Sequence, residues 1–380
     1  YIMPCRSFGL LGTATSSSES PVTIPMRGQE IYNARHNVLK DSPITQLLLE
    51  GGILTADALM KEGKYFSING LGSIPDELSI LQNAFLNSYI DHENVNMTYD
   101  RFRQTVFWSF KAIKTQDLNA PEIIQNNYML VALDKQRDKS NVVIAWAEYE
   151  LRRRVHFALE LLLSSLTDTL LNLTEGRVED ILNEWIAEED IPDLLSDILP
   201  YKLIPWKKKV GDVEKELAFD TFLANGLSRN QIRMLTPCPR AIYALVILVV
   251  TINQTKKIRR DNLIKNRNDY LEKADALIKD YRDSTMLDLL RSLLIQCVIA
   301  PHLATTLRKM AQGQKCSLRF YPDGQLLRPT GTGARAGYSG DRLSNVLLML
   351  SDLGFLHLEK NKYKLLKNGQ EMLSEMEKNK

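Results

Sequence analysis

Residues 141–172 read NVVIAWAEYELRRRVHFALELLLSSLTDTLLN and carry the strongest helical pattern in the chain. No glycine or proline interrupts them, and apolar residues run from Val142 to Leu171. The charged residues cluster in the first half, so the second half, which is almost all apolar, is expected to be deeply buried. At a rise of about 1.5 Å per residue, a helix of this length spans roughly 45 Å. We expect it to be the central helix of a mainly α body.

The other long apolar run follows at 241–250, AIYALVILVV. A membrane span needs about 20 predominantly apolar residues, so this run is too short to cross a bilayer. A helix that is apolar on all sides is typical of a protein core. A buried strand is the second reading, because isoleucine and valine are frequent in the run. Further helices are predicted over 178–186, 262–282 and 284–312, the last kinked or broken at Pro301.

Glycine and proline define the predicted domain limits. Gly9, Gly12, a serine run, Pro21 and Pro25 break any period in residues 1–42, which are expected to be irregular. A glycine- and proline-rich stretch begins at Gly313 and separates the body from a terminal domain. We therefore predict three parts: an irregular segment 1–42, a helical body 43–312 and a C-terminal domain 313–380.

Composition places the chain among ordinary globular proteins, with 44% apolar and 25% charged residues. The net charge of +2 favours neither nucleic acid nor an anionic membrane. Charge is uneven, however, because residues 308–380 hold 13 Lys and Arg against 7 Asp and Glu. The four cysteines are widely spaced, which is typical of reduced thiols in a cytoplasmic protein. No signal peptide is visible, and no membrane contact is expected.

The last 40 residues carry a pattern of their own. Leucines and Val346 form one helical face between Leu343 and Leu353, and Gly354 occupies a position that favours a helix end. Three further elements are predicted: a strand at 355–358, a partner strand at 363–366 and a final helix ending near Met376.

This order resembles the winged-helix superfamily, which has a helix, a junction of the form L-x-x-L-G-F, a two-stranded wing and a final helix. The junction here is Leu350–Phe355. The resemblance implies a C-terminal winged-helix (α+β) domain on a multi-helix body. In DNA-binding members the helix before the wing enters the major groove. By that resemblance and by the need for clustered positive charge at phosphate, the expected nucleic-acid-binding residues are Arg335, Arg342, Asn345, Lys360, Lys362 and Lys364.

Signs of catalysis are weak. Gly331, Gly333 and Gly337 do not match the dinucleotide fingerprint, which needs G-x-G-x-x-G in a βαβ unit, and a linker is the favoured interpretation. Arg152 and His156 resemble the Arg–His pair of HEPN-type ribonucleases, but only three residues separate them, where that family has four to six. The five histidines show no metal-ligand spacing. No catalytic residue, metal site or cofactor is therefore predicted.

Three functions remain open on these grounds. The leading hypothesis is a non-enzymatic protein that binds duplex DNA through its winged helix, with the helical body serving assembly or partner docking. The alternative is a structural or adaptor subunit of a larger bacterial complex, in which the winged helix binds protein. The third is a helical nuclease with a cryptic active site. A further basic cluster is interpreted as a solvated helix face or a partner interface, with a second nucleic-acid contact as the alternative: Lys256, Lys257, Arg259, Arg260, Lys265 and Arg267.

Overall fold

The computed structural model of the protein is mostly helical, with a few short strand pairs. It divides into two compact units: unit 1 is Tyr1–Ile123 with Asp341–Lys380, and unit 2 is Ile124–Gly340. The structure describes residues 8–13, 22–86, 97–138, 140–187, 205–217, 228–252, 258 and 270–378.

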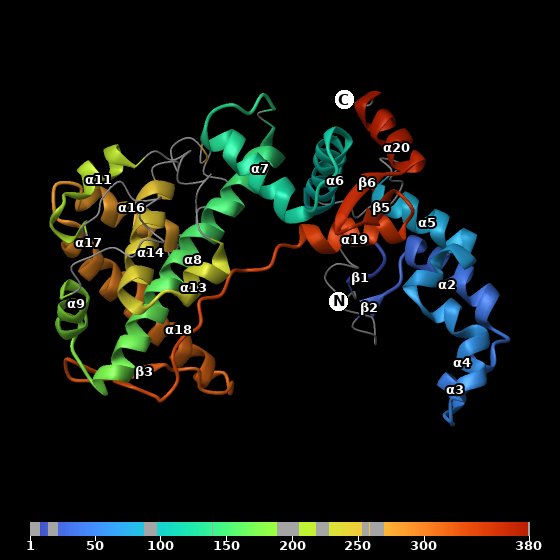
Figure 1. Cartoon of the computed structure of the whole chain (residues 1–380). Coiled ribbons are helices and arrows are strands. Elements are labelled where there is room, and N and C mark those ends of the chain that lie inside the picture. The colour runs from blue at the N-terminus through green and yellow to red at the C-terminus, as the bar shows by residue number, and fades with distance from the viewer. Residues whose placement is uncertain are drawn as a thin grey trace. The chain divides into compact units, whose positions relative to one another are not determined.

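Two helices form the core of unit 2. Helix α8, Asn141–Leu173, runs through the middle of the unit, and α14, Pro237–Ile252, packs along it (Figure 1). Every residue from Cys238 to Ile252 is buried. The apolar run at 241–250 is thus a helix enclosed on all sides, as predicted, and the strand reading is wrong. The prediction of a long central helix at 141–172 is also confirmed.

A buried arginine stands at the start of α14. Arg240 is 7% exposed, and its Nη1 donates to Ser164 Oγ at 2.6 Å and to Asp168 Oδ2 at 2.7 Å, both on α8. Its Nε and Nη2 donate to the Leu235 carbonyl oxygen at 3.1 and 2.6 Å. Because a buried charge is costly unless it is paired and hydrogen-bonded, this network is what allows an arginine at the helix interface.

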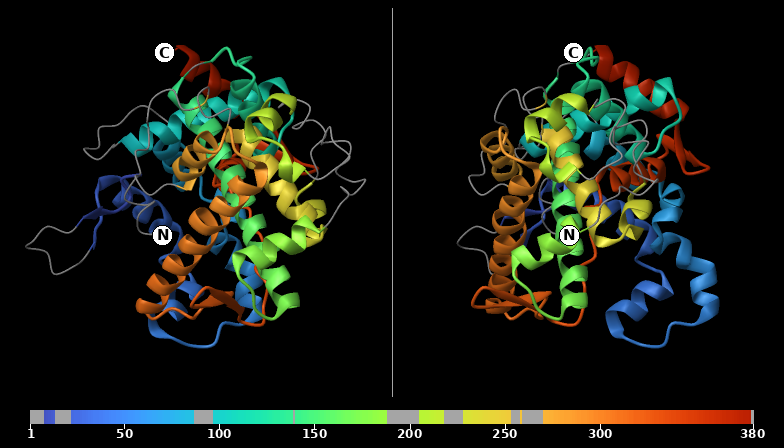
Figure 2. Two further views of the ribbon diagram at one scale, coloured as in Figure 1. Left: turned by 90° about the vertical axis from the view of Figure 1, so that its left-hand side faces the viewer. Right: turned by 60° about the vertical axis from the view of Figure 1, so that its left-hand side comes forward.

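The rest of unit 2 surrounds this pair. The helix that contains α17, η4 and α18 runs beside α8 in Figure 2, and the β3–β4 hairpin follows it. The other elements of unit 2, with α7 beginning just before its boundary, are α7 (Ala120–Ala132), α9 (Val178–Ile186), η3 (Pro205–Lys207), α11 (Val210–Glu216), α13 (Arg229–Met234), α16 (Tyr270–Asp280), α17 (Met286–Leu293), η4 (Leu294–Ile299), α18 (Ala300–Ala311), β3 (Phe320–Asp323) and β4 (Leu326–Pro329).

The predicted break at Pro301 takes a specific form. The helix continues through Pro301, and the six residues Leu294–Ile299 form a π-helical turn before it. Proline has no N–H to donate, and its ring clashes with the carbonyl of the residue four positions earlier, here Cys297. Widening the helix in that turn accommodates both effects without ending the helix.

One helix among the described residues, Met286–Ala311, is long and apolar enough to cross a membrane. Of the most apolar 18-residue stretch of this helix, 44% is buried inside the protein. Length and composition of this kind also occur in core helices of water-soluble proteins.

Unit 1 joins N-terminal helices to the C-terminal segment. Arg35 of α2 donates to Glu77 of α5 at 3.0 Å and to the Tyr65 carbonyl at 2.6 Å, which ties the N-terminal helices together. The elements are β1 (Gly12–Thr13), β2 (Val22–Thr23), α2 (Met26–Leu39), α3 (Pro43–Glu50), α4 (Ala56–Glu62), η1 (Gly63–Phe66), η2 (Ile68–Ser73), α5 (Pro75–Leu86), α6 (Met97–Thr115), α19 (Leu343–Asp352), β5 (Leu356–Glu359), β6 (Lys362–Leu365) and α20 (Lys367–Lys378).

The C-terminal segment is held to the N-terminal helices by backbone and side-chain contacts. The Gln82 side chain of α5 donates to the Leu353 carbonyl at 2.8 Å, and the Tyr363 amide donates to the Leu118 carbonyl at 3.0 Å. Phe355, just before β5, packs against Phe110 of α6. Residues 341–378 therefore share a core with the described residues before 124.

These units differ from the three predicted ranges 1–42, 43–312 and 313–380. Residues 313–340 belong with the helical body, whereas 341–380 belong with the N-terminal region. Helix α2, Met26–Leu39, lies in the segment expected to be irregular. The predicted elements of the C-terminal segment are all present as helix, strand pair and helix.

Replacement of Arg240 by alanine is expected to lower the free energy of unfolding by about 2–4 kcal/mol, because it leaves the Leu235 carbonyl and Ser164 hydroxyl without their donor. Urea unfolding followed by circular dichroism measures this loss. Arg137→Ala, at an exposed position of the same unit, serves as the control and should change stability by less than about 0.5 kcal/mol. Equal effects of the two substitutions would contradict the role given to Arg240.

Candidate functional site

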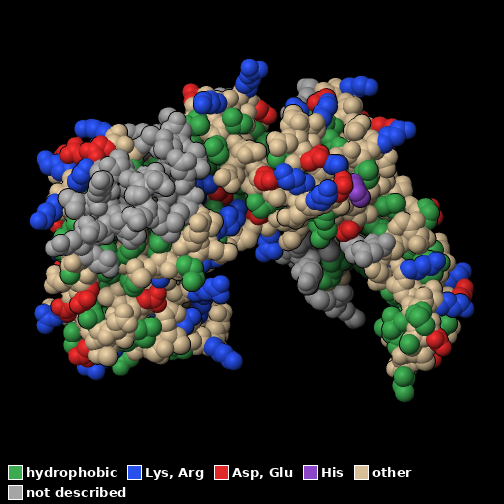
Figure 3. Space-filling model, in the orientation of Figure 1, with side chains coloured by type: hydrophobic (Ala, Val, Ile, Leu, Met, Phe, Trp, Pro, Cys, Tyr) green, Lys and Arg blue, Asp and Glu red, His purple; other side chains and the backbone are tan. Residues whose placement is uncertain are grey.

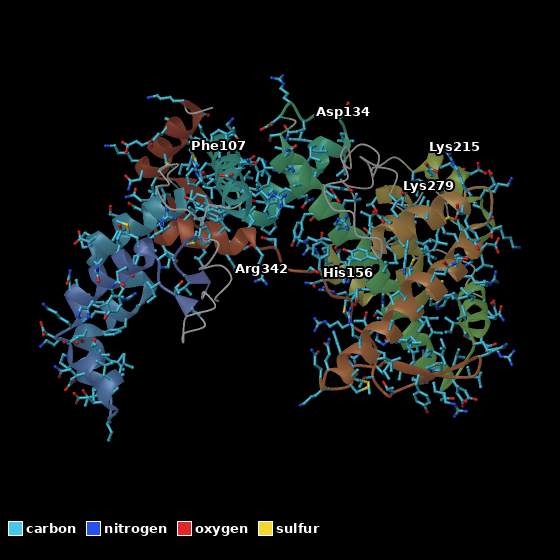
Figure 4. The ribbon with its side chains drawn as sticks, turned by 180° about the vertical axis from the view of Figure 1, so that it is seen from behind. Phe107, Asp134, His156, Lys215, Lys279 and Arg342 are labelled. Atoms are coloured by element: carbon cyan, nitrogen blue, oxygen red, sulfur yellow. The ribbon has the colours of Figure 1, made fainter. Side chains whose placement is uncertain are left out.

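Helix α19 presents two of the predicted nucleic-acid-binding residues at its surface. Leu343, Leu347 and Leu350 form its buried face, whereas Arg342 at its N-cap position and Asn345 in its first turn are exposed (Figure 4 labels Arg342). Leu348 on the same helix is 49% exposed. The outward face thus carries one cation, one amide and one large apolar side chain.

The three predicted lysines lie on the β5–β6 hairpin and differ in whether a carboxylate pairs with them. Lys360 and Asn361 form its two-residue turn with φ of 48° and 63°, the backbone of a type I′ turn. Lys362 pairs with Glu122 at 3.3 Å. Lys364 pairs with Glu359 at 2.8 Å and with Asp117 at 3.6 Å.

These ion pairs reduce the positive charge that the hairpin offers to a ligand. The hydrogen bond and charge of Glu359 raise the pKa of Lys364, and the same contact lowers the pKa of Glu359. Lys360 and Arg342 have no carboxylate partner within the described residues. Arg335 belongs to unit 2, so the six predicted residues do not lie in one unit. Sequence spacing could not reveal these acidic partners, because Asp117 and Glu122 precede the lysines by more than two hundred positions.

The glycine-rich stretch is a fixed strap rather than a free linker. We call residues 331–340 the strap; the chain there has no helix or strand and lies along α8. Gly333 lies so close to Asp168 that a Cβ atom there would collide with the Asp168 carboxylate. Four hydrogen bonds hold the strap to α8 and α13: Ala334 N to Thr167 Oγ1 (2.8 Å), Arg233 Nε to the Ala336 carbonyl (2.9 Å), Tyr338 Oη to Glu150 Oε1 (2.8 Å) and Tyr149 Oη to the Gly340 carbonyl (3.1 Å).

Arginines surround the anchor of the strap. The ring of Tyr338 lies 3.5 Å from the Arg229 guanidinium carbon and 4.4 Å from that of Arg153, both cation–π contacts. Glu150, 4% exposed, accepts from Arg154 Nε at 3.0 Å as well as from Tyr338. Burial and the Glu150 charge raise the pKa of Tyr338, so its hydroxyl stays protonated as a donor. The cluster therefore anchors the strap.

The Arg152 and His156 side chains of α8 lie beside acidic side chains of the same helix. Arg152 donates to Glu148 at 2.8 Å, one turn away. His156, labelled in Figure 4, lies 3.8 Å from Glu160 and edge-on to the Tyr270 ring. Each member thus has its own acidic neighbour on the helix. Within the part of the chain that the structure describes, no group of three or more His, Cys, Asp or Glu could hold a metal ion.

A second cationic surface lies on unit 2. We call it the basic surface; Figure 3 shows lysine and arginine side chains gathered over α18. It lies at the end of α18, on the chain that follows and on the strap. None of its members has a carboxylate partner among the described residues. The members are Arg308, Lys309, Lys315, Arg319 and Arg335. Of these five residues, Arg335 is the one that the sequence pattern predicted. The basic cluster between Lys256 and Arg267 falls outside the described residues.

A third surface, on unit 1, is apolar. Ser42 caps α3 and Thr55 caps α4, and Ile44 is the one buried residue of either helix. Figure 3 shows hydrophobic side chains gathered at this part of the unit. We call it the apolar surface; its large side chains are 45–87% exposed and are Leu48, Leu49, Ile53, Leu54, Leu59 and Met60.

In comparisons with known proteins, no protein-family model, no curated protein and no solved structure matches the chain.

Gly333→Ala is expected to lower stability by about 1–3 kcal/mol, because the added methyl group must displace Asp168 from its pairing with Arg240. Gly337→Ala in the same strap is the matched control, since its Cβ would meet nothing within 4 Å. Thermal unfolding of both variants measures the difference. If Gly337→Ala were as destabilising as Gly333→Ala, close approach of the strap to α8 would not be the cause.

Proposed function

We propose that this chain is a non-enzymatic adaptor or assembly protein that binds a protein partner through the apolar surface of α3 and α4. The observation that supports this most directly is the unbroken exposure of residues 48–57, which include Leu48, Leu49, Ile53 and Leu54. Large contiguous apolar patches on a protein surface mark interaction sites.

The energetics favour a partner for this surface. Full burial of one leucine, isoleucine or methionine side chain contributes about 1.5–3 kcal/mol, and six such residues are exposed here. Only part of that sum would appear as affinity, because association costs translational freedom and side-chain order. Few charges interrupt the patch: Glu50 and Asp57 lie within it, and Lys61 and Glu62 at its end. A protein surface with an apolar centre and a polar rim matches this pattern.

A second candidate function is DNA association through α19 and the β5–β6 hairpin, used as a winged helix. The order of helix, strand pair and helix supports it, as do exposed Arg342, Asn345 and Lys360. Two observations favour protein contact at α19 and the hairpin instead. Carboxylates already pair with Lys362 and Lys364, and the apolar side chain of Leu348 is exposed. An outward helix face with one cation fits adaptor use better than major-groove entry. We therefore place this function second.

A cytoplasmic location accompanies the proposal. Among the described residues Cys238, Cys297 and Cys316 are free thiols, and the first two are buried. Burial raises the pKa of the Cys297 thiol to about 11, which keeps it protonated and inert. Unpaired cysteines of this kind are typical of reducing compartments.

A photo-crosslinking amino acid at Leu49 is expected to give a discrete product with a partner chain in cells. Ile53→Glu with Met60→Glu should abolish the product, because two charges would be buried at the contact. Gln46→Glu adds charge to an exposed polar position of α3 and should leave the product unchanged. The proposal fails if Leu49 gives no more product than the same crosslinker at exposed Gln370 of α20.

DNA association through unit 1 has a separate test. Arg342→Gln and Lys360→Gln should each reduce the slope of log affinity against log salt by about 1 if both side chains contact phosphate. Lys362→Gln and Lys364→Gln should have smaller effects, because carboxylates already pair with these lysines. Fluorescence anisotropy with a duplex measures the slopes. Unchanged slopes for Arg342→Gln and Lys360→Gln would remove this candidate.

A further inference from the structure

The basic surface of unit 2 has an unusual charge balance. Residues 289–340 contain seven Lys and Arg but a single acid, Asp323. Arg291 is held by Glu179 and Asp288, and Arg328 by Glu175 and Asp323. The other five cations of the stretch have no carboxylate partner among the described residues. They are Arg308, Lys309, Lys315, Arg319 and Arg335.

Backbone geometry brings two of these segments together. Arg308 and Lys309 occupy the last turn of α18, where the chain reverses at Gly313 with φ of 75°. The Gln314 amide donates to the Lys309 carbonyl at 3.0 Å, so Lys315 begins the return segment next to that turn.

Arg319 connects this turn to the strap. Its guanidinium donates to Thr332 Oγ1 at 2.8 Å, and its backbone amide donates to His302 Nε2 of α18 at 3.2 Å. Arg335 follows three residues after Thr332 and is exposed. The end of α18, the return segment and the strap therefore present their cations in one region of unit 2.

The electrostatic consequence is visible at His302. Burial lowers the pKa of this imidazole, and the charges of Arg319 and Lys309 lower it further. Cations from two segments thus act at the same point without a compensating acid there. Such a region binds an anion more readily than a surface where each cation has a partner.

We propose that the end of α18, the segment that follows it and the strap form a surface that binds the phosphate backbone of duplex nucleic acid. Exposed Gln312, Gln314, Ser317 and Thr332 lie among the cations and offer the amide and hydroxyl donors that commonly contact phosphate. Binding of single strands relies on successive aromatic side chains, and Tyr321 of β3 is the one exposed aromatic side chain between residues 300 and 340.

An anionic membrane is the competing partner, because Leu307 and Met310 are exposed beside Arg308 and Lys309. Only two large apolar side chains of α18 are exposed, which makes a small apolar face, whereas a membrane-surface helix buries a full stripe. The polar donors between the cations therefore favour the nucleic acid backbone. This surface is distinct from α19 and the hairpin, and it does not depend on the apolar surface of α3 and α4.

The test uses the full chain and a fluorescent duplex of random sequence, with anisotropy measured from about 50 to about 200 mM KCl. If all five cations contact phosphates, log affinity should fall with log salt with a slope of about −4 to −5. The triple variant Arg308→Gln, Lys309→Gln, Lys315→Gln should reduce that slope by about 3 and weaken binding strongly at the lower salt concentration.

The matched control removes three exposed cations elsewhere in unit 2, Lys135→Gln, Arg137→Gln and Lys207→Gln, and should keep the wild-type slope. Circular dichroism must show equal helix content for both triple variants. The proposal would be overturned if both triple variants lost duplex affinity equally, or if the wild-type protein did not bind the duplex. Binding to vesicles that contain phosphatidylserine, without binding to duplex, would overturn it in favour of a membrane. None of these results depends on the crosslinking at Leu49. Failure of this proposal can therefore be distinguished from failure of the adaptor function.

Discussion

The burial of α14 against α8 is the constraint on which unit 2 depends. A helix that is enclosed on every side offers no surface for a charge, yet Arg240 stands in its first turn and is buried. Its five N–H groups can be satisfied only by fixed acceptors. Leu235 O accepts two of these N–H groups, and Ser164 Oγ and Asp168 Oδ2 accept one each, so the network fixes both the start of α14 and its position along α8.

The same network determines where the chain can pass next. Gly333 can approach α8 beside Asp168 because it lacks a Cβ atom, and the amide of the neighbouring Ala334 donates a hydrogen bond to Thr167 Oγ1. Farther along, Tyr338 enters the arginine cluster and donates to Glu150. A segment rich in glycine is usually costly to order, since each ordered residue loses about 1–2 kcal/mol of conformational entropy. The strap offsets that cost with contacts at intervals along α8, and it therefore carries Arg335 in a fixed place.

Sequence patterns predicted the parts of this structure that rest on local physics. The long helix at 141–172, the enclosed helix at 241–250 and the helix–hairpin–helix order after Leu343 follow from periodicity, glycine and turn residues. Features that depend on distant partners were missed. Glu122 and Asp117 pair with hairpin lysines, and Tyr338 meets Glu150, across separations that no local pattern encodes. The β3–β4 hairpin was also missed, because glycines and prolines around it indicated a loop.

The three surfaces differ in how their charges are matched, and this difference decides between their uses. On the β5–β6 hairpin, carboxylates from the same unit already neutralise Lys362 and Lys364, so a phosphate would have to compete with them. On α18 and the strap the cations have no such competitor among the described residues, and a phosphate would meet positive potential without displacing a partner. On α3 and α4 charge is sparse, and removal of water from apolar side chains is the available driving force. The ligands proposed for these last two surfaces would therefore be held by different forces: removal of water from apolar side chains for a protein partner, and uncompensated positive charge for a polyanion.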